Sequence, residues 1–197
     1  MLTEMTRRLL PFLLVLAGSA QATVAPFGIS LEATSADLQA MDSLYVPSLK
    51  AWVTDRPPRP DTRFEMVVIN HSPRYGVCAV MGMQRVTSDD TGAGARRALD
   101  ALRTELERAY GPAVPLDRLN AGSRLTGERQ WLAGIAARER WYGASWHAEL
   151  HDLPEELNAV ILNVSTGKTT REVFVGVQYR AASYDLCMAD LTQPAGR

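Results

Sequence analysis

The chain has 197 residues, 21 lysine and arginine against 22 aspartate and glutamate side chains, a formal net charge of −1, and 46% hydrophobic residues. This length and apolar content predict one domain with a buried core, and they argue against disorder, collagen-like repeats and coiled coil. A nearly neutral chain lacks the basic stripe that attracts phosphates, so we expect no nucleic-acid partner.

The N-terminus has the order of segments found in a secretory signal peptide. Arg7 and Arg8 precede an apolar run over 9–17, and Ala20 and Ala22 occupy the two positions where signal peptidase requires small residues. The apolar run is too short to cross a bilayer as a helix, which needs about 20 residues. The alternative, a buried N-terminal helix of a cytosolic protein, does not account for this order of segments.

We therefore expect a signal peptide over 1–22 and a single α+β domain over 23–197. No second apolar segment of spanning length follows, so the mature chain is expected to have no transmembrane segment and to be periplasmic or secreted. A lipid anchor is not expected, because Ser19 stands where a lipoprotein would have its cysteine.

The two cysteines, Cys78 and Cys187, are far apart in the sequence. An oxidising compartment favours a structural disulfide between them. Their spacing fits neither a zinc site nor a C-x-x-C redox motif. Two buried free thiols and a catalytic thiol are the alternatives.

The N-terminal half predicts a short helix, a loop and a hairpin. Thr34 and Asp37 form a capping-box pattern for a helix that continues to Met41. Several prolines predict an extended, solvated loop over 56–60. The predicted hairpin has strands over 64–69 and 75–83, joined by a turn over 70–74.

The C-terminal half predicts two helices and a second hairpin. Apolar residues at spacings of three and four predict a helix from Ala93 to Tyr110, which Gly111 and Pro112 end. A second helix is predicted from Thr126 to about His147. The second hairpin has strands over 157–164 and 172–179, with a loop over 165–171. The expected fold class is α+β, an antiparallel sheet built from two hairpins packed against two main helices.

Three of the four tryptophans fall on the predicted helix over 126–147, with arginines between them. Two faces of that helix then carry large aromatic side chains, and only one of them can pack on the sheet. The other face, around Trp141, is a candidate partner surface, since Trp, Tyr and Arg dominate binding hot spots. The candidate partner-binding residues are Arg138, Arg140, Trp141 and Trp146. The alternative is that a long connection or the proline-rich loop covers Trp141.

His147 and His151 lie four residues apart, so on a helix they would share one face and could both bind zinc. Known zinc-protease motifs place a glutamate directly beside a histidine, whereas Glu149 lies between these two. Pro154 also follows closely and ends the helix. Two interpretations remain: surface histidines near a helix end, or a transition-metal site completed by a carboxylate such as Asp152.

Two adjacent segments resemble known exported proteins. Residues 27–31 (FGISL), followed by 34–38 (TSADL), resemble the strand-turn-helix start of the beta-lactamase-inhibitor-protein-like and outer-membrane-assembly-lipoprotein families. Those families commonly have glycine in place of Glu32, and the lipid-bearing cysteine of the lipoproteins is absent here. The helix end over 110–112 (YGP) is similar to uncharacterised exported bacterial proteins. The resemblance implies a helix-on-sheet binding module with no active site.

The sequence thus predicts an exported, non-enzymatic protein that binds another protein or the cell envelope and needs no cofactor. The alternative is a metal-dependent hydrolase that uses His147, Glu149 and His151. A purely structural envelope component is a third class, which the sequence does not distinguish from the first.

Overall fold

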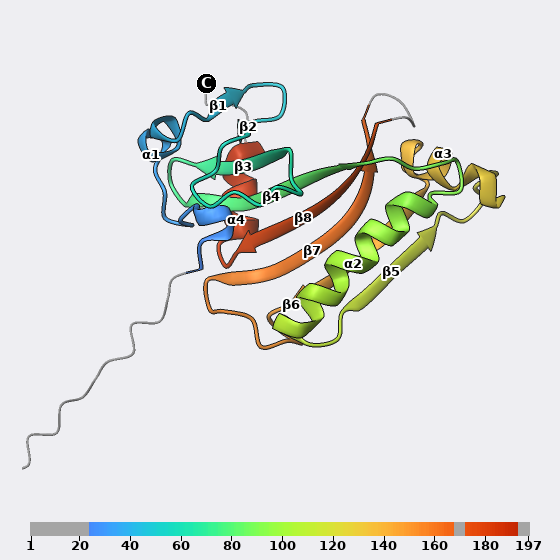
Figure 1. Cartoon of the computed structure of the whole chain (residues 1–197). Coiled ribbons are helices and arrows are strands. Elements are labelled where there is room, and N and C mark those ends of the chain that lie inside the picture. The colour runs from blue at the N-terminus through green and yellow to red at the C-terminus, as the bar shows by residue number, and fades with distance from the viewer. Residues whose placement is uncertain (1–23, 168–171, 193–197) are drawn as a thin grey trace, which may run out of the picture.

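The computed structural model describes residues 24–167 and 172–192. Within them, eight strands form one antiparallel sheet in the order β1-β2-β3-β4-β8-β7-β6-β5 (Figure 1). The strands are Leu44–Val46 (β1), Ala51–Thr54 (β2), Met66–Ser72 (β3), Gly76–Val86 (β4), Val114–Leu119 (β5), Arg140–His147 (β6), Leu157–Thr166 (β7) and Val173–Ala181 (β8). The predicted signal peptide over 1–22 lies outside the described residues.

Four α-helices and two short 3-10 helices accompany the sheet in the described part of the chain. The α-helices are Ser35–Ala40 (α1), Ala93–Tyr110 (α2), Trp131–Ala136 (α3) and Tyr184–Thr192 (α4), and the 3-10 helices are Pro26–Gly28 (η1) and Glu128–Gln130 (η2). None of the helices described is long and apolar enough to span a membrane.

The two predicted hairpins are confirmed as β3–β4 and β7–β8, and they form the centre of the sheet because β4 pairs with β8. The predicted helix α1 also forms. The Thr34 side chain accepts a hydrogen bond from the Asp37 backbone N–H, and the Asp37 carboxylate accepts one from the Thr34 N–H, so the capping box is complete. The chain before it forms η1 and not a strand.

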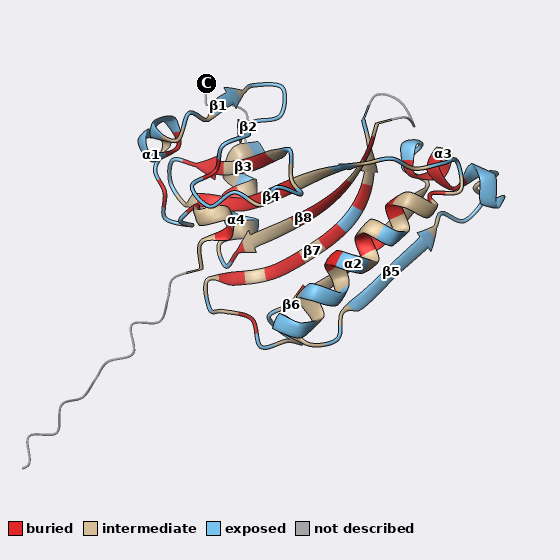
Figure 2. Ribbon diagram, in the orientation of Figure 1, coloured by how far each residue is buried: buried red, intermediate tan, exposed pale blue. Residues whose placement is uncertain are grey.

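Helix α2 begins and ends where the sequence predicts, at Ala93 and Tyr110. Its apolar stripe, which includes the buried Leu99 and Leu102, packs on β7 and β8, while its outer face is exposed (Figure 2). Gly111 has φ +82° and follows the helix, a backbone conformation that favours glycine.

The predicted helix over 126–147 is wrong. Helix α3 ends at Ala136, and the chain then enters strand β6 at Arg140. Within β6, the side chains of Tyr142 and Trp146 point to the core and their neighbours point away, which is the two-residue period of a strand. Aromatic residues favour strands, so the local preference also fits β6.

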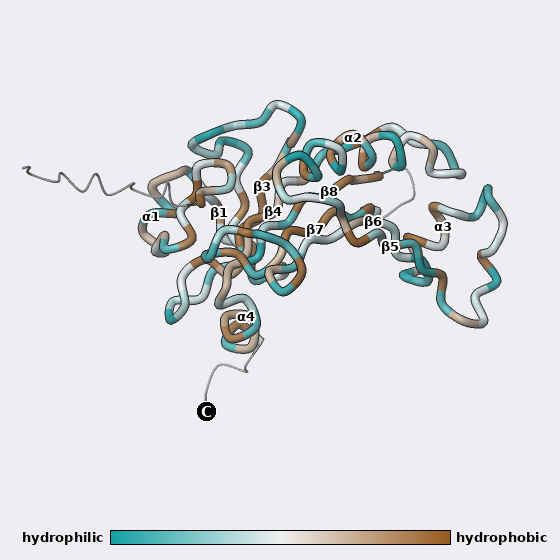
Figure 3. Tube along the Cα trace, turned by 90° about the horizontal axis from the view of Figure 1, so that it is seen from below, coloured by the Kyte–Doolittle hydropathy of each residue, from teal (hydrophilic) through white to brown (hydrophobic). Residues whose placement is uncertain are grey.

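Helices α2 and α4 lie on opposite sides of the sheet (Figure 3). Helix α4 packs against β3 and β4, and the Cys78–Cys187 disulfide joins it to β4 with a Cα–Cα distance of 5.5 Å. The predicted pairing of the two cysteines is therefore confirmed. The Ser72 hydroxyl adds a second link by donating to Asp190 Oδ2 at 2.6 Å.

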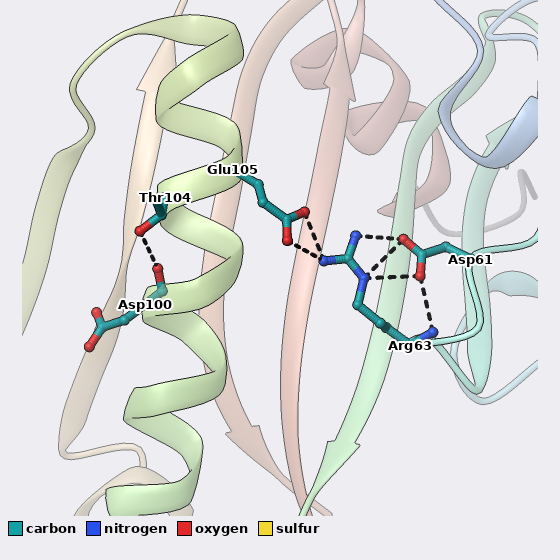
Figure 4. A network of polar contacts seen from close by, with 5 residues as sticks. All are labelled: Asp61, Arg63, Asp100, Thr104 and Glu105. Atoms are coloured by element: carbon teal, nitrogen blue, oxygen red, sulfur yellow. Dashed lines mark hydrogen bonds and ion pairs between the residues drawn. The ribbon is translucent and has the colours of Figure 1, made fainter.

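A charged network fixes α2 to the loop before β3 (Figure 4). The Arg63 guanidinium donates to Asp61 Oδ2 at 2.7 Å and to both oxygens of Glu105 at 2.8 Å. Hydrogen bonds from Arg63 hold the pKa of Asp61 below its usual range, and the two carboxylates hold the pKa of Arg63 above its own. The loop is thus attached to the helix across a sequence separation of 42 residues.

Candidate functional site

The sheet has one face covered by α2 and α3, and we name the opposite one the open face. Successive side chains of a strand point to opposite faces. In β7, Val160 and Leu162 are fully buried beneath α2, whereas Ile161 is half-buried and Asn163 is exposed on the other side. The same alternation in the neighbouring strands shows that much of the open face meets solvent.

Helix α4 covers only one end of the open face. It lies over β3 and β4 near Ser72 and Cys78, to which it is attached through Asp190 and Cys187. The helix has no substantial contact with β5, β6 or β7 in the described residues. The open face from the middle of β3 to β5 is therefore not covered by any helix described.

Large apolar side chains occupy this uncovered area. Cross-strand pairing places Met66, Met83 and Leu116 in one row across the sheet, and the row between Met83 and Leu116 is formed by Gly176, Asn163 and Gly143. All the apolar members of the area are half-buried or exposed, and Leu44 is 70% exposed. They are Leu44, Val53, Met66, Met83, Val114, Leu116, Trp141, Ile161 and Phe174.

One end of the open face contains an apolar hollow of about 470 Å³, which we name the trough. Its apolar side chains come from five adjacent strands, β1 to β4 and β8. The side chains that line it are Asp42, Leu44, Val46, Val53, Thr54, Asp55, Glu65, Met66, Met83, Arg85 and Phe174. It is therefore a largely apolar channel with charged groups along its margin.

The charges of the trough are unbalanced. Arg85 Nε lies 3.1 Å from Glu65 Oε2, and its guanidinium lies 5.1 Å from the centre of the Phe174 ring. The remaining carboxylates, Asp42 and Asp55, form no ion pair or side-chain hydrogen bond within the part of the chain described. The trough thus has an excess of negative charge beside an apolar floor.

The end of the sheet formed by β5 and β6 is basic and aromatic. The guanidinium of Arg118 lies 4.5 Å from the centre of the Trp141 ring. Arg138, Arg140 and Trp141 also line a hollow of about 360 Å³ between α3 and the ends of β6 and β7. Arg140 Nη1 pairs with Asp117 Oδ1 at 3.0 Å, and its buried Nε has no hydrogen-bond partner in the described residues. We name this the basic hollow.

The structure brings together three of the four predicted partner-binding residues and separates the fourth. Arg138, Arg140 and Trp141 meet at the basic hollow. Trp146 is fully buried on the helix face, where its Nε1 donates to the Gly111 carbonyl oxygen at 2.8 Å. In this fold Trp146 is a core residue and has no surface for a partner.

The histidine pair does not form a ready metal site. His147 is the last residue of β6 and His151 lies in the following turn, so the two do not share a helix face. His151 Nε2 lies 2.9 Å from the Pro112 carbonyl oxygen, and His151 Nδ1 accepts from the His147 backbone N–H at 3.2 Å. His147 Nε2 lies 3.0 Å from Ser145 Oγ. Among the residues described, no group of three histidine, cysteine or carboxylate side chains is placed to hold a metal ion.

His71 and Tyr142 are titratable groups that line neither the trough nor the basic hollow. Burial lowers the pKa of His71, which is 7% exposed and lies near Ser35. Burial likewise raises the pKa of Tyr142. These shifts are consistent with core positions, because no substrate-sized hollow among those described contains either side chain.

The trough is not predicted from the sequence, because two of its strands, β1 and β2, lie in a proline-containing segment for which no strand is predicted. The signal present in the sequence is the unbroken apolar character of MVVI over 66–69 and VCAVMGM over 77–83. Strands that face water on one side normally alternate polar and apolar residues. Continuous apolar runs therefore indicate apolar side chains on both faces.

Comparison with family models, with curated proteins and with solved structures finds no match for this chain. The function of the site must therefore follow from its own geometry.

Proposed function

We propose that this chain is an exported, non-catalytic binding protein and that its open face contacts a protein partner. The observation that carries the proposal is the set of large apolar side chains on the uncovered part of the sheet. The solvent-facing side of an antiparallel sheet is normally polar. Large apolar side chains exposed on such a face instead mark an interaction site.

The extent of this face favours a macromolecular partner. Phe174, which lines the trough, is the cross-strand partner of Ser165, which lines the basic hollow, so the two hollows adjoin at the β7–β8 pair. Half-buried Ile161 in β7 and exposed Leu116 in the edge strand β5 lie on the same face. A small molecule would occupy one hollow, whereas a protein can contact both hollows and the exposed side chains of the neighbouring strands.

Export has separate support. The order of charged, apolar and small residues over 1–22 is that of a signal peptide, and disulfides such as Cys78–Cys187 persist in oxidising compartments. We propose a periplasmic or secreted location. Sequencing the N-terminus of the exported protein should give Thr23 as the first residue, and an intact N-terminus in the cytoplasm would contradict this part of the proposal.

The alternative of a metal-dependent hydrolase has less support. It requires His147, Glu149 and His151 to converge, but the ring nitrogens of His151 already lie within hydrogen-bond distance of backbone atoms. Glu149 is exposed in the turn after β6. A chelator-sensitive hydrolytic activity that is lost in His147→Ala would favour this alternative.

Site-specific photocross-linking in the producing cells tests the binding face. A photoreactive phenylalanine at Ile161 presents the probe on the open face, and the same residue at Ala101 presents it on the exposed side of α2. We expect one discrete protein adduct from position 161 and none from position 101. Adducts of equal yield from both positions, or from position 101 alone, would contradict the proposal.

A further inference from the structure

The trough has the shape of a seat for a protruding chain segment. It crosses the five strands β1, β2, β3, β4 and β8, and since adjacent strands lie about 4.8 Å apart, its length is about 19 Å. Its volume of about 470 Å³ lies within the range of about 300–1,000 Å³ for ligand clefts. Met66 and Met83 contribute flexible side chains that can adjust to an apolar occupant.

The margin of the trough specifies the charge of that occupant. Three carboxylates and one guanidinium line it, so its net charge is −2. Asp42 precedes β1 and Asp55 follows β2, and the pairing of Leu44 with Val53 places both carboxylates at the same end of this hairpin. Two like charges without a partner among the described residues favour a cation beside them.

We propose that the trough binds an apolar segment of a partner protein that carries lysine or arginine beside its apolar side chains. The inference rests on the proposed function of the open face and adds the chemistry of the partner. Aliphatic or aromatic side chains of the segment pack on Val53, Met66, Met83 and Phe174, and its cationic groups pair with Asp42 and Asp55.

The same features disfavour other occupants. An excess of negative charge repels anionic lipid headgroups and nucleic-acid phosphates. The trough is also open to solvent at its wall, because Leu44 is 70% exposed. An open wall leaves part of an occupant in solvent, whereas small-ligand sites enclose most of their ligand.

Three capped pentapeptides with the same apolar centre, leucine-phenylalanine-leucine, test the charge requirement. They carry lysine, serine or glutamate at both ends. Each is titrated into the disulfide-bonded domain with ¹³C-labelled methionine methyl groups, and the NMR signals of Met66 and Met83 report binding. We expect both signals to shift with the lysine peptide, whose Kd should be at least tenfold lower than that of the glutamate peptide, with the serine peptide between them.

A matched pair of double variants assigns the effect to the trough. Asp42→Asn with Asp55→Asn removes the two carboxylates that have no partner among the described residues. Glu149→Gln with Glu155→Gln makes the same change of net charge at exposed positions outside it. We expect the first pair to weaken lysine-peptide binding at least fivefold and to reduce the preference over the glutamate peptide, while the second pair leaves both unchanged.

Several outcomes would overturn the inference. These are equal affinity for the three peptides, no methyl shift with any of them, methyl shifts confined to methionines outside the trough, or equal weakening by the two double variants. Decyltrimethylammonium is the small-molecule control, and binding tighter than that of the lysine peptide would assign the trough to a small amphiphilic cation. A cross-link from Ile161 together with a negative peptide result would leave the binding face intact and refute only the charge assignment.

Discussion

Gly92 shows how one backbone position controls the packing of α2 against α3. It precedes α2 with φ +73°, and a Cβ placed there would collide with the indole of Trp131, which is 4% exposed. We predict that Gly92→Ala destabilises the domain by about 2–4 kcal/mol, because it combines left-handed backbone strain with overpacking. Urea denaturation measures the loss.

Gly122 provides the matched control for that prediction. Its φ is +84°, and a Cβ placed at this position would meet no atom within 4 Å beyond its chain neighbours. Gly122→Ala should therefore cost only the backbone strain, about 1–2 kcal/mol. Equal losses in the two variants would show that the contact with Trp131 is not the cause.

Arg63 joins the loop before β3 to α2 through Asp61 and Glu105. Its side chain is 40% exposed, so solvent screens the ion pairs, and Arg63→Ala should cost about 1 kcal/mol. Arg63→Lys should recover only part of the loss, because lysine cannot form the forked hydrogen bonds of arginine. Urea denaturation at neutral pH measures both variants.

The effect of Arg63 should also depend on pH. The pKa of Asp61 is lower in the folded protein than in the unfolded chain, whose aspartates titrate near about pH 4. The unfolded chain therefore binds the proton first, and the stabilisation is complete above that pH and is lost as the pH falls below it. The stability difference between wild type and Arg63→Ala should shrink below about pH 4. A constant difference down to about pH 2 would show that Arg63 acts by packing alone.

At the scale of elements, the sequence predicts those segments whose periodicity is strong and whose ends are marked. Helix α2 has a regular apolar stripe, which identifies it as a helix, and a glycine-proline pair, which marks its end. The helix over 126–147 fails, because apolar and aromatic residues at 141, 142 and 146 fit a helix stripe and a strand equally well over so short a span. Residues 140–147 form a strand because they pair with β5 and β7. This pairing joins segments that are separated in the sequence, so local pattern does not reveal it.

The candidate site is predictable only where its residues are adjacent in sequence. The interleaved arginines and tryptophans make Arg138, Arg140 and Trp141 candidates, and these three line the basic hollow although the helix predicted for them does not form. The trough escapes sequence reasoning, since it combines residues from Asp42 to Phe174 that only the strand order brings together. Trp146, the fourth candidate partner-binding residue, is instead fully buried, because in a strand it shares its face with the buried Ala144.

The disulfide allows a prediction at the level of helix α4. Replacing Cys78 and Cys187 by alanine opens a loop with a sequence separation of 109 residues, which should cost about 2–5 kcal/mol. The hydrogen bond between Ser72 and Asp190 remains, but it is a weaker attachment. Compared with wild type, we expect deuterium exchange to become faster at the amides of α4 and to change less at the amides of β7. Unchanged exchange in α4 would show that the disulfide does not hold the helix on the sheet.

At the scale of the whole molecule, the helices are distributed unequally over the two faces of one sheet. Helix α2 covers β6 to β8 on one face, and α4 covers one end of β3 and β4 on the other. Two complete layers would bury the apolar side chains of β3, β4, β7 and β8 on both faces. No described helix covers the open face beyond α4. The apolar side chains on that part of the face are therefore available to another molecule, and this exposure is the basis of the proposed function.

Adjacent positions of β7 test this layered arrangement. Leu162 is fully buried against the helices, and Leu162→Ala should destabilise the domain by about 2–5 kcal/mol, because it removes apolar contacts and leaves a cavity. Ile161 points to the open face, so Ile161→Ala should cost about 1 kcal/mol or less while reducing the yield of partner adducts from a photoreactive residue placed at Leu116. Urea denaturation measures both losses. A loss at Ile161 as large as that at Leu162 would show that another part of this same chain covers the open face, and the binding surface would then have to lie elsewhere.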